Sequence, residues 1–254
     1  MNTKQDYIAV FDSGVGGISV LRQLRRILPR ERFLYYGDSA NAPYGIRSNA
    51  QIMELTMTAA EHLLRLDVKA LVVACNTATA VAIEALRSRW PDKIIIGIEP
   101  ALKLAADRFP GGAVGVMATP VTLREEKFSH LLERCADRCR VTKLPITGLV
   151  ELIEAGELSA AEALLSPVLG SHAGKLDAVV LGCTHYPFAA EAISRILGPG
   201  TVLLDGGEGT AQQTRRRLAE AGLLSDGPGG VVFENSAADP KVLALCRRLA
   251  DCPE

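Results

Sequence analysis

Two cysteines of the sequence, Cys75 and Cys183, stand in matching surroundings that suit acid–base chemistry. Each follows a short apolar run, at residues 70–74 and 178–182, and each precedes polar residues that are expected to open a helix. A thiol at a helix N-terminus has its thiolate stabilised by backbone N–H groups and the helix dipole, which lowers its pKa from roughly 8.5 towards neutrality. One such cysteine is more often a small buried side chain. Two such cysteines in matched positions favour a functional role over a purely structural one.

A pair of thiols could exchange the α-proton of a free amino acid. Racemisation without a cofactor needs one group that removes the proton from one face and a second, protonated group that delivers a proton to the other face. Two groups of equal basicity suit both directions, because each must be the base for one enantiomer and the acid for the other. Beside these cysteines the sequence offers no Schiff-base lysine context and no set of metal ligands. It therefore predicts a reaction without pyridoxal phosphate or metal.

Polar residues near both cysteines are candidates to assist the thiols. Asp12 opens the loop 12–17, where it could orient or assist Cys75, while Ser13 could cap the helix that follows. The free N–H groups of this loop could also hold a carboxylate, and its glycine spacing differs from that of a dinucleotide-binding loop. His185 could exchange protons with the neighbouring thiol near pH 7, although a lone histidine is more often structural.

Three further groups of residues allow two interpretations each. Turn formation explains the Pro, Gly and Asn of loop 37–45, but Tyr44 and the backbone of Gly45 are candidate ligand contacts. Cys135 and Cys139 are four residues apart, yet nothing near them completes a zinc site, so we expect core or surface helix positions. Four arginines near one predicted helix end could contact phosphate or form a solvated face: Arg22, Arg25, Arg26 and Arg30.

The elements that must position these residues alternate between short β-branched runs and longer amphipathic stretches. We expect strands at 7–11, 32–36, 70–74, 93–98, 113–118, 141–146, 177–182, 201–205 and 229–233. We expect helices at 17–28, 48–66, 77–89, 100–108, 120–135, 148–173, 187–197, 207–221 and 239–250. This alternation is typical of α/β proteins with parallel sheets flanked by helices, in which ligands bind at the carboxyl ends of the strands.

A weak internal repeat predicts two similar domains. Residues 10–14 are echoed 106 positions later, and residues 70–77 are echoed 108 positions later. We therefore expect two α/β domains related by a pseudo-twofold axis, with the active site in the cleft between them. The first domain would comprise 1–98 plus 208–254 and carry Asp12 and Cys75. The second would comprise 99–207 and carry Cys183.

The composition favours a small-molecule partner. The 28 basic and 29 acidic side chains give no strong field for nucleic acid or an anionic membrane. The N-terminal apolar run is too short for a secretory signal, and no stretch supplies the ~20 apolar residues of a membrane span. The sequence thus predicts a cytoplasmic protein whose cysteines stay reduced. The sequence does not decide whether the protein forms a homodimer.

With these residues in view, the chain resembles the glutamate racemases of the aspartate/glutamate racemase superfamily over roughly residues 8–220. The resemblance rests on the stretches VFDSGVGGISV, YYGDSANAPYG, LVVACNTATA, IGIEP, VGVMAT and VVLGCTHYPF. It implies interconversion of L- and D-glutamate without a cofactor, supplying D-glutamate for bacterial peptidoglycan. It also implies that Cys75 takes the α-proton from D-glutamate and Cys183 from L-glutamate, assisted by Asp12 and His185 respectively.

The resemblance implies further site residues. Substrate contacts would come from Asp12, Ser13, Tyr44, Gly45, Asn76, Thr77, Thr119, Thr184 and His185. A glutamate is implied near the second thiol, and of Glu151 and Glu154 the alignment favours Glu154 as a catalytic residue. Residues 205–208 depart from the Asp-Ser that the family often has after the late strand.

Other functions would use the same features differently. An aspartate racemase shares the two-cysteine chemistry and differs only in the loops that sense side-chain length. A dithiol oxidoreductase would need the two cysteine Cα atoms within ~6 Å, which leaves no room for an amino acid between the thiols. A binding module without catalysis would have no need of both cysteines.

Overall fold

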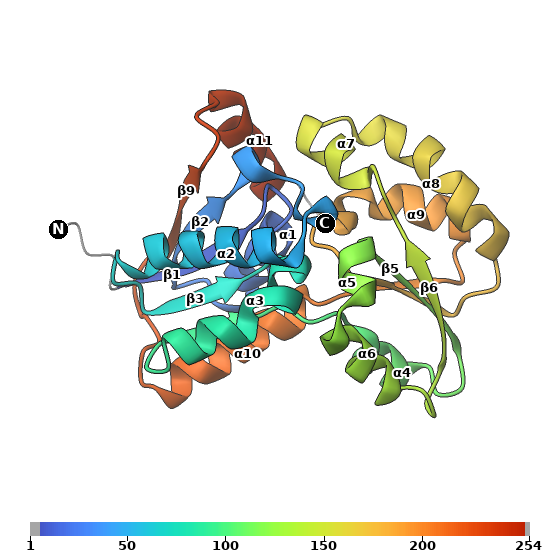
Figure 1. Ribbon diagram of the computed structural model, residues 1–254, viewed down its shortest axis with the longest axis horizontal. Coiled ribbons are helices and arrows are strands. Elements are labelled where there is room, and N and C mark those ends of the chain that lie inside the picture. The colour runs from blue at the N-terminus through green and yellow to red at the C-terminus, as the bar shows by residue number, and fades with distance from the viewer. Residues whose placement is uncertain (1–5, 252–254) are drawn as a thin grey trace. The chain divides into compact units, whose positions relative to one another are not determined.

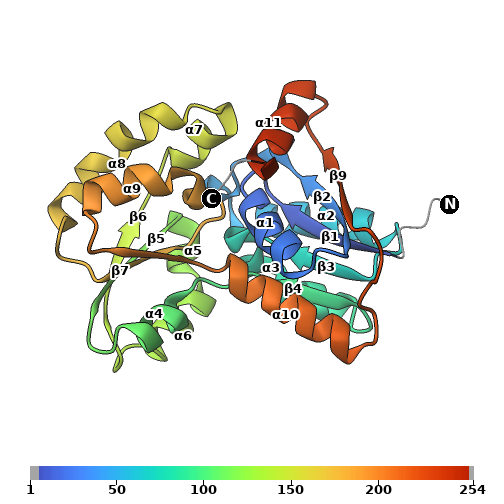
Figure 2. The same ribbon diagram turned by 180° about the vertical axis from the view of Figure 1, so that it is seen from behind.

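Two sheets of parallel strands, each covered by helices, make up the computed structural model of the chain (Figures 1 and 2). The structure describes residues 6–251, so the first and last few positions of the predicted first domain lie outside the described residues. Contacts divide the described chain into two units. The first runs up to Ile98 and resumes at Gly207, and the second is Glu99–Gly206.

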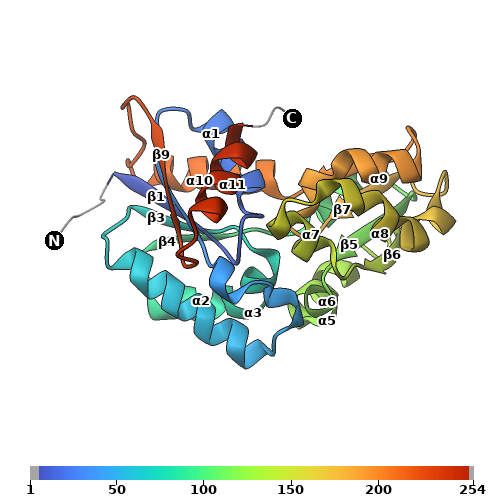
Figure 3. The same cartoon turned by 90° about the horizontal axis from the view of Figure 1, so that it is seen from above.

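The first unit contains a five-stranded sheet of order β4-β3-β1-β2-β9. Its strands are β1 (Tyr7–Asp12), β2 (Arg32–Gly37), β3 (Ala70–Val73), β4 (Ile94–Gly97) and β9 (Gly230–Asn235). Its helices are α1 (Ile18–Ile27), α2 (Asn49–Leu64), α3 (Asn76–Arg89), α10 (Gly207–Glu220) and α11 (Pro240–Asp251). Helices α1, α10 and α11 lie together on one face of the sheet, and α2 and α3 lie on the other (Figure 3).

The second unit contains a four-stranded sheet of order β6-β5-β7-β8. Its strands are β5 (Ala113–Ala118), β6 (Arg140–Pro145), β7 (Ala178–Leu181) and β8 (Val202–Asp205). Its helices are α4 (Leu102–Arg108), α5 (Pro120–Arg124), α6 (Glu126–Glu133), α7 (Leu149–Ala155), α8 (Ala161–Leu169) and α9 (Ala190–Leu197). The parallel α/β architecture that the alternation predicts is confirmed in both units.

Strand registers show the internal repeat directly. Val10 of β1 is paired with Val72 of β3, and Val116 of β5 is paired with Val180 of β7. These two pairs are related by the same offsets that relate the repeated sequences. The order β6-β5-β7-β8 therefore corresponds to β2-β1-β3-β4, and β9 is the additional strand of the first sheet.

Two expected helices are each split in the structure. The stretch 120–135 forms α5 and α6, separated by Glu125, whose backbone is extended (φ −66°, ψ 142°). The stretch 148–173 forms α7 and α8, because Gly156 adopts a left-handed conformation (φ 76°) that ends α7. The apolar periodicity continues across both breaks, so the hydrophobic pattern alone predicts one long helix in each case.

Burial explains why the central strands lack alternation of polar and apolar residues. All residues of β3 and β7 are buried, as are Ile8 to Asp12 of β1, because helices cover both faces of each sheet. Polar residues of these segments are therefore displaced to the strand ends. Among the described residues, no helix is long and apolar enough to cross a membrane.

Candidate active site

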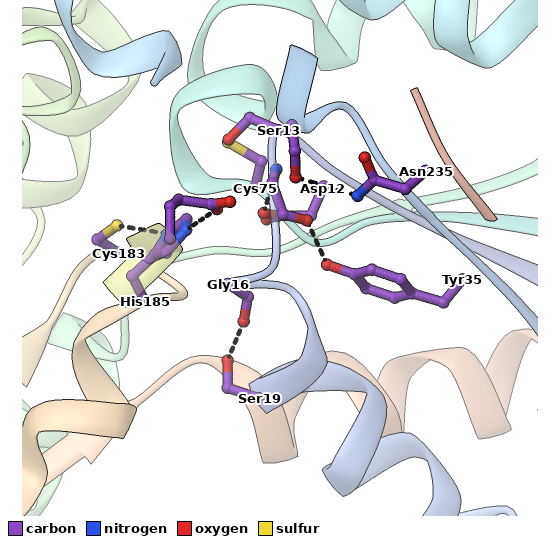
Figure 4. A network of polar contacts seen from close by, with 12 residues as sticks. Asp12, Ser13, Gly16, Ser19, Tyr35, Cys75, Cys183, His185 and Asn235 are labelled. Carbon is purple, nitrogen blue, oxygen red and sulfur yellow. Dashed lines mark hydrogen bonds and ion pairs between the residues drawn. The ribbon is translucent and has the colours of Figure 1, made fainter. Parts of the chain in front are cut away.

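Cys75 lies at the carboxyl edge of the first sheet, beside the loop that follows β1 (Figure 4). It is the N-cap of α3, and its sulfur accepts a hydrogen bond from the Ala78 N–H at 3.4 Å. Its thiol donates to Ser13 Oγ, also at 3.4 Å. The side chain is only 5 % exposed. The predicted position at a helix N-terminus is therefore confirmed for Cys75, with a hydroxyl as an additional partner.

The loop after β1 is held by hydrogen bonds to both backbone polar groups of one residue, Gly14. Buried Asp12 accepts the Gly14 N–H at 3.0 Å through Oδ1, and the hydroxyl of Tyr35 donates to the Gly14 carbonyl at 2.6 Å (Figure 4). Helix α1 begins at Ile18, and its N-cap Gly17 has no side-chain cap. The prediction that Ser13 caps this helix is wrong, because the loop makes a further turn before the helix begins.

Tyr35→Phe should lower the free energy of unfolding by about 1–3 kcal/mol, because the buried Gly14 carbonyl loses its donor. The measurement is urea unfolding followed by the fluorescence of Trp90, the only tryptophan, which caps α3 of the same unit. Tyr36→Phe removes a hydroxyl from the next, less buried residue of β2 and is the control. Equal losses in the two variants would contradict the assigned role of the Tyr35 hydroxyl.

Asn76 and Thr77 occupy the first turn of α3 and are buried. Among the described residues, neither the amide nitrogen nor the amide oxygen of Asn76 has a hydrogen-bond partner. Buried polar groups are normally satisfied, and an exception calls for a physical explanation. A ligand that both donates and accepts hydrogen bonds would satisfy this side chain.

Tyr44 and Gly45 lie in a 3-10 turn, Tyr44–Ile46, that follows β2. The hydroxyl of Tyr44 donates to Asp38 Oδ2 at 2.7 Å, and the side chain is 1 % exposed. Burial and the Asp38 carboxylate raise the pKa of Tyr44 far above its ordinary value, so the phenol stays protonated. Asp38, which the sequence analysis did not single out, thus fixes this loop. Ligand contact by Tyr44 or Gly45 stays a prediction.

Cys183 follows β7 in the second unit and belongs to a chain of three acid–base groups. Its sulfur lies 3.7 Å from His185 Nδ1, and His185 Nε2 lies 2.6 Å from Oε1 of Glu154 on α7. His185 is 2 % exposed. Burial alone would lower the pKa of His185, but its hydrogen bonds and charge interactions with Cys183 and Glu154 raise it well above the ordinary value. Its two neighbours therefore favour the protonated imidazole.

A helix does open after Cys183, but it is a 3-10 helix, and the expected match to the first turn of α3 is wrong. The Tyr186 N–H bonds back to the Cys183 carbonyl, a 3-10 turn follows at Tyr186–Ala189, and α9 begins only at Ala190. Residues 184–186 therefore form a turn where residues 76–78 form the first turn of a helix. The Cys183 sulfur therefore contacts the imidazole of His185, whereas the Cys75 sulfur contacts a backbone N–H of the helix.

Two threonines of the second unit correspond to site residues of the first. Under the repeat, Thr119 matches Ser13 and Thr184 matches Asn76, and both threonines are buried. Thr119 is the N-cap of α5 and accepts the Thr122 N–H at 3.3 Å. The structure thus brings each predicted site residue to the carboxyl edge of the sheet in its own unit.

Tyr186 is a site neighbour that the sequence analysis missed. It is fully buried, and its pKa is raised by burial and by the charges of Cys183 and Glu151. Its hydroxyl donates to the Ile146 carbonyl at 3.4 Å, which links the turn after Cys183 to the segment that leads into α7. Glu151 therefore lies near Tyr186, whereas Glu154 makes the contact with His185.

Cys135 and Cys139 belong to the apolar core of the second unit. They lie in the connection between α6 and β6, not on the helix that the sequence predicts. Burial raises the pKa of both thiols. Within residues 6–251, no group of three or more His, Cys, Asp or Glu side chains is placed to hold a metal ion.

Comparison with known proteins gives one consistent family. The family model described as Asp/Glu/Hydantoin racemase matches residues 9–214. A glutamate racemase of Clostridium botulinum is 44 % identical over 256 residues, covering 99 % of each chain.

Solved structures agree with this match. Glutamate racemase of Francisella tularensis, in complex with D-glutamate, superimposes with a TM-score of 0.84 at 28 % identity and covers 98 % of this chain and 94 % of that one. Glutamate racemase of Thermus thermophilus, in complex with β-chloro-D-alanine, gives a TM-score of 0.81 at 39 % identity and covers 99 % and 96 %.

Proposed function

Because the chain belongs to the Asp/Glu/hydantoin racemase family and is an amino-acid racemase, we propose that it interconverts L- and D-glutamate with the thiols of Cys75 and Cys183. The observation that carries the proposal is that equivalent strands, β3 and β7, each end in a buried cysteine with its own acid–base partners. A symmetric reaction needs two such groups, because each enantiomer requires its own base.

The reaction moves one proton off and another proton onto the α-carbon. The Cys75 thiolate takes the α-proton of D-glutamate, and the electron pair of the broken C–H bond stays on a carbanion stabilised by the neighbouring carboxylate. The Cys183 thiol then donates its proton to the opposite face and gives L-glutamate. The reverse reaction exchanges the roles. The mechanism requires that both sulfur atoms reach opposite faces of one α-carbon when the substrate is bound.

Different neighbours stabilise the two thiolates. At Cys75, the Ala78 N–H donates to the sulfur, and the hydroxyl of Ser13 can turn to donate to the thiolate in the same way. Asp12 shapes the Ser13 loop and can assist this thiol. At Cys183 the positive charge of His185, held by Glu154, favours the thiolate.

Buried polar groups beside the cysteines supply substrate contacts in this proposal. The amide of Asn76 can bond both the amino group and a carboxylate of glutamate, because it has a donor and an acceptor without partners among the described residues. Thr77 follows it in α3, and Thr119 and Thr184 supply hydroxyls in the second unit. Tyr44 and Gly45 complete the set from the loop after β2.

Glu154→Gln should slow proton removal from the L-enantiomer, because it removes a charge that raises the pKa of His185. His185 is cationic below its folded-state pKa, so its support of the Cys183 thiolate is lost as pH rises through that value. In the variant this loss occurs at lower pH. At pH values above the wild-type pKa, the rate in the variant should be about tenfold lower for each unit by which the pKa drops.

The measurement is the pH profile of proton abstraction from L-glutamate in deuterated water, together with an NMR titration of His185. Glu151→Gln, on the same helix, is the matched control, because Glu154 is the residue that bonds the imidazole whereas Glu151 lies near Tyr186. A shift of the His185 titration in the Glu151 variant and not in the Glu154 variant would reverse the assignment of the two residues.

The proposed function itself is tested by incubating chelator-treated protein with L-glutamate in deuterated water. We expect optical rotation to decay while deuterium enters the α-position, with no pyridoxal absorbance and no loss of activity on chelation. Retained α-protium in the product, or activity that requires added metal, would exclude the two-thiol mechanism. A higher kcat/KM for aspartate than for glutamate would change the proposed substrate.

We further propose that the D-glutamate formed in the cytoplasm supplies peptidoglycan synthesis.

A further inference from the structure

A pocket of about 910 Å³ opens in the first unit at the opposite end of the sheet from Cys75. It is bordered by Pro29 and Gly229, which precede β2 and β9, and by the last turn of α11. The catalytic loops instead follow the carboxyl ends of the strands. The volume lies in the range of pockets that hold small molecules, ~300–1,000 Å³, and nothing in the proposed reaction uses it.

The floor of this pocket is apolar. It includes Phe33 of β2 and two residues of the neighbouring β9, Val231 and Phe233. Phe33 is paired with Val231 in the sheet, so their side chains stand next to each other on the face that α1 and α11 cover. The ring of Phe233 contacts that of Tyr35 at a centroid distance of 6.1 Å. Phe33 is only 1 % exposed, so an apolar ring or chain of a ligand would bury surface mainly against the partly exposed Val231 and Phe233.

One wall of the pocket carries positive charge. Arg22, Arg25 and Arg26 of α1 all line it, and their spacing of three and four residues places them on one face of the helix. The ion pairs of Arg25 with Asp251 (3.7 Å) and of Arg26 with Glu208 (3.5 Å) are solvent-exposed, so they hold the guanidinium groups weakly. A ligand anion can therefore compete for them.

The carboxylate of Glu31, which also lines the pocket, does not cancel this charge. Its side chain is 1 % exposed and forms an ion pair with Lys69 at 2.5 Å. Its other oxygen accepts the Ser225 N–H at 2.9 Å. Asp251 is the other carboxylate of the lining, so the three arginines still leave the pocket net cationic.

We propose that this pocket binds an organic anion that carries a phosphate or carboxylate on an apolar body. Guanidinium groups form paired hydrogen bonds with both kinds of anion. Stabilising the C-terminus of α1 would account for Arg25 and Arg26 in the last turn. It does not account for Arg22, one turn earlier on the same face, or for the apolar floor below these residues.

Calorimetric titration of the full chain tests the site with four probes: phenyl phosphate, benzoate, inorganic phosphate and benzyl alcohol. Each titration is run without glutamate and again with saturating glutamate, which occupies the proposed catalytic site. We expect at least one of the two aromatic anions to bind at least tenfold more tightly than both inorganic phosphate and benzyl alcohol, since only the aromatic anions contact wall and floor together. The stronger of the two identifies the anionic group. Equal affinity of all four probes, or binding that glutamate abolishes, would overturn the proposal.

Two variants locate the binding. Arg22→Gln and Arg25→Gln should each weaken binding of the aromatic anion about tenfold or more. Of the two changes, Arg22→Gln preserves the hydrogen bond from Arg25 to the Ala250 carbonyl. Arg215→Gln removes the same charge from an exposed position of α10 outside the pocket and should leave the affinity unchanged. Equal weakening in all three variants would show that overall charge, and not this pocket, attracts the anion.

Discussion

Cys75→Ser is expected to abolish racemisation of both enantiomers, and Cys183→Ser is expected to do the same. A serine hydroxyl has nearly the shape of the thiol but is far too weakly acidic to supply a comparable population of base near neutral pH. The loss should be at least the 10²–10⁴-fold that a positioned acid–base group contributes. Cys135→Ser, a change at a buried core cysteine of the second unit, controls for the loss of a thiol alone.

A substrate with a leaving group on its β-carbon separates the two thiols. With β-chloroalanine, removal of the α-proton leaves an electron pair that forms a double bond as the C–Cl bond breaks and chloride departs. This elimination needs a base but no opposite acid. Cys75→Ser should still process the L-enantiomer and Cys183→Ser the D-enantiomer, each having lost the mirror reaction. If either variant lost both eliminations, a single shared base would replace the two-thiol mechanism.

The two thiols share a position in the fold but not a chemical environment. Cys75 caps α3 and contacts Ser13, whereas Cys183 contacts the buried pair of His185 and Glu154. The pH dependence of the two half-reactions should therefore differ, since His185 titrates and the helix N–H groups do not. The strands of the two units are thus equivalent, whereas the groups that stabilise the thiolate differ between the units.

The sequence is most informative where burial dictates residue type. Strands covered on both faces must be apolar throughout, so β1, β3, β5 and β7 stand out as short β-branched runs. Their ends are also where polar side chains reappear, which is why Asp12, Cys75 and Cys183 can be selected from the sequence. The constant spacing of the repeat then predicts that equivalent strands take equivalent places, as the paired registers show.

Contacts between distant segments escape sequence analysis. Tyr35 of β2 reaches the Gly14 carbonyl in the loop that follows the neighbouring strand β1, and nothing in its local sequence signals this bond. Similarly, the sequence predicts that Thr184 and His185 open an α-helix, and only the bond from the Tyr186 N–H to the Cys183 carbonyl shows that a 3-10 helix comes first. Glu151 and Glu154 are three residues apart and share one face of α7, so the choice between them depends on which turn of the helix lies against His185.

Lys69→Met is expected to destabilise the protein more than Tyr35→Phe does. Lys69 and Glu31 form an ion pair with side chains only 7 % and 1 % exposed, and the ammonium also donates to the Leu223 carbonyl at 2.8 Å. Removing the lysine leaves a buried carboxylate without its counter-charge, which costs about 3–5 kcal/mol. The same change leaves the carboxyl edge of the sheet, with Cys75, intact.

The cost arises from the orphaned charge, so removing the second charge should recover much of it. Glu31→Gln keeps the oxygen that accepts the Ser225 N–H, and the double variant Lys69→Met with Glu31→Gln should be clearly more stable than Lys69→Met alone. Urea unfolding followed by Trp90 fluorescence reports on this unit, because the only tryptophan of the chain ends α3. If the two changes simply added, the lysine would act through its packing against the sheet, and the ion pair would contribute little of its own.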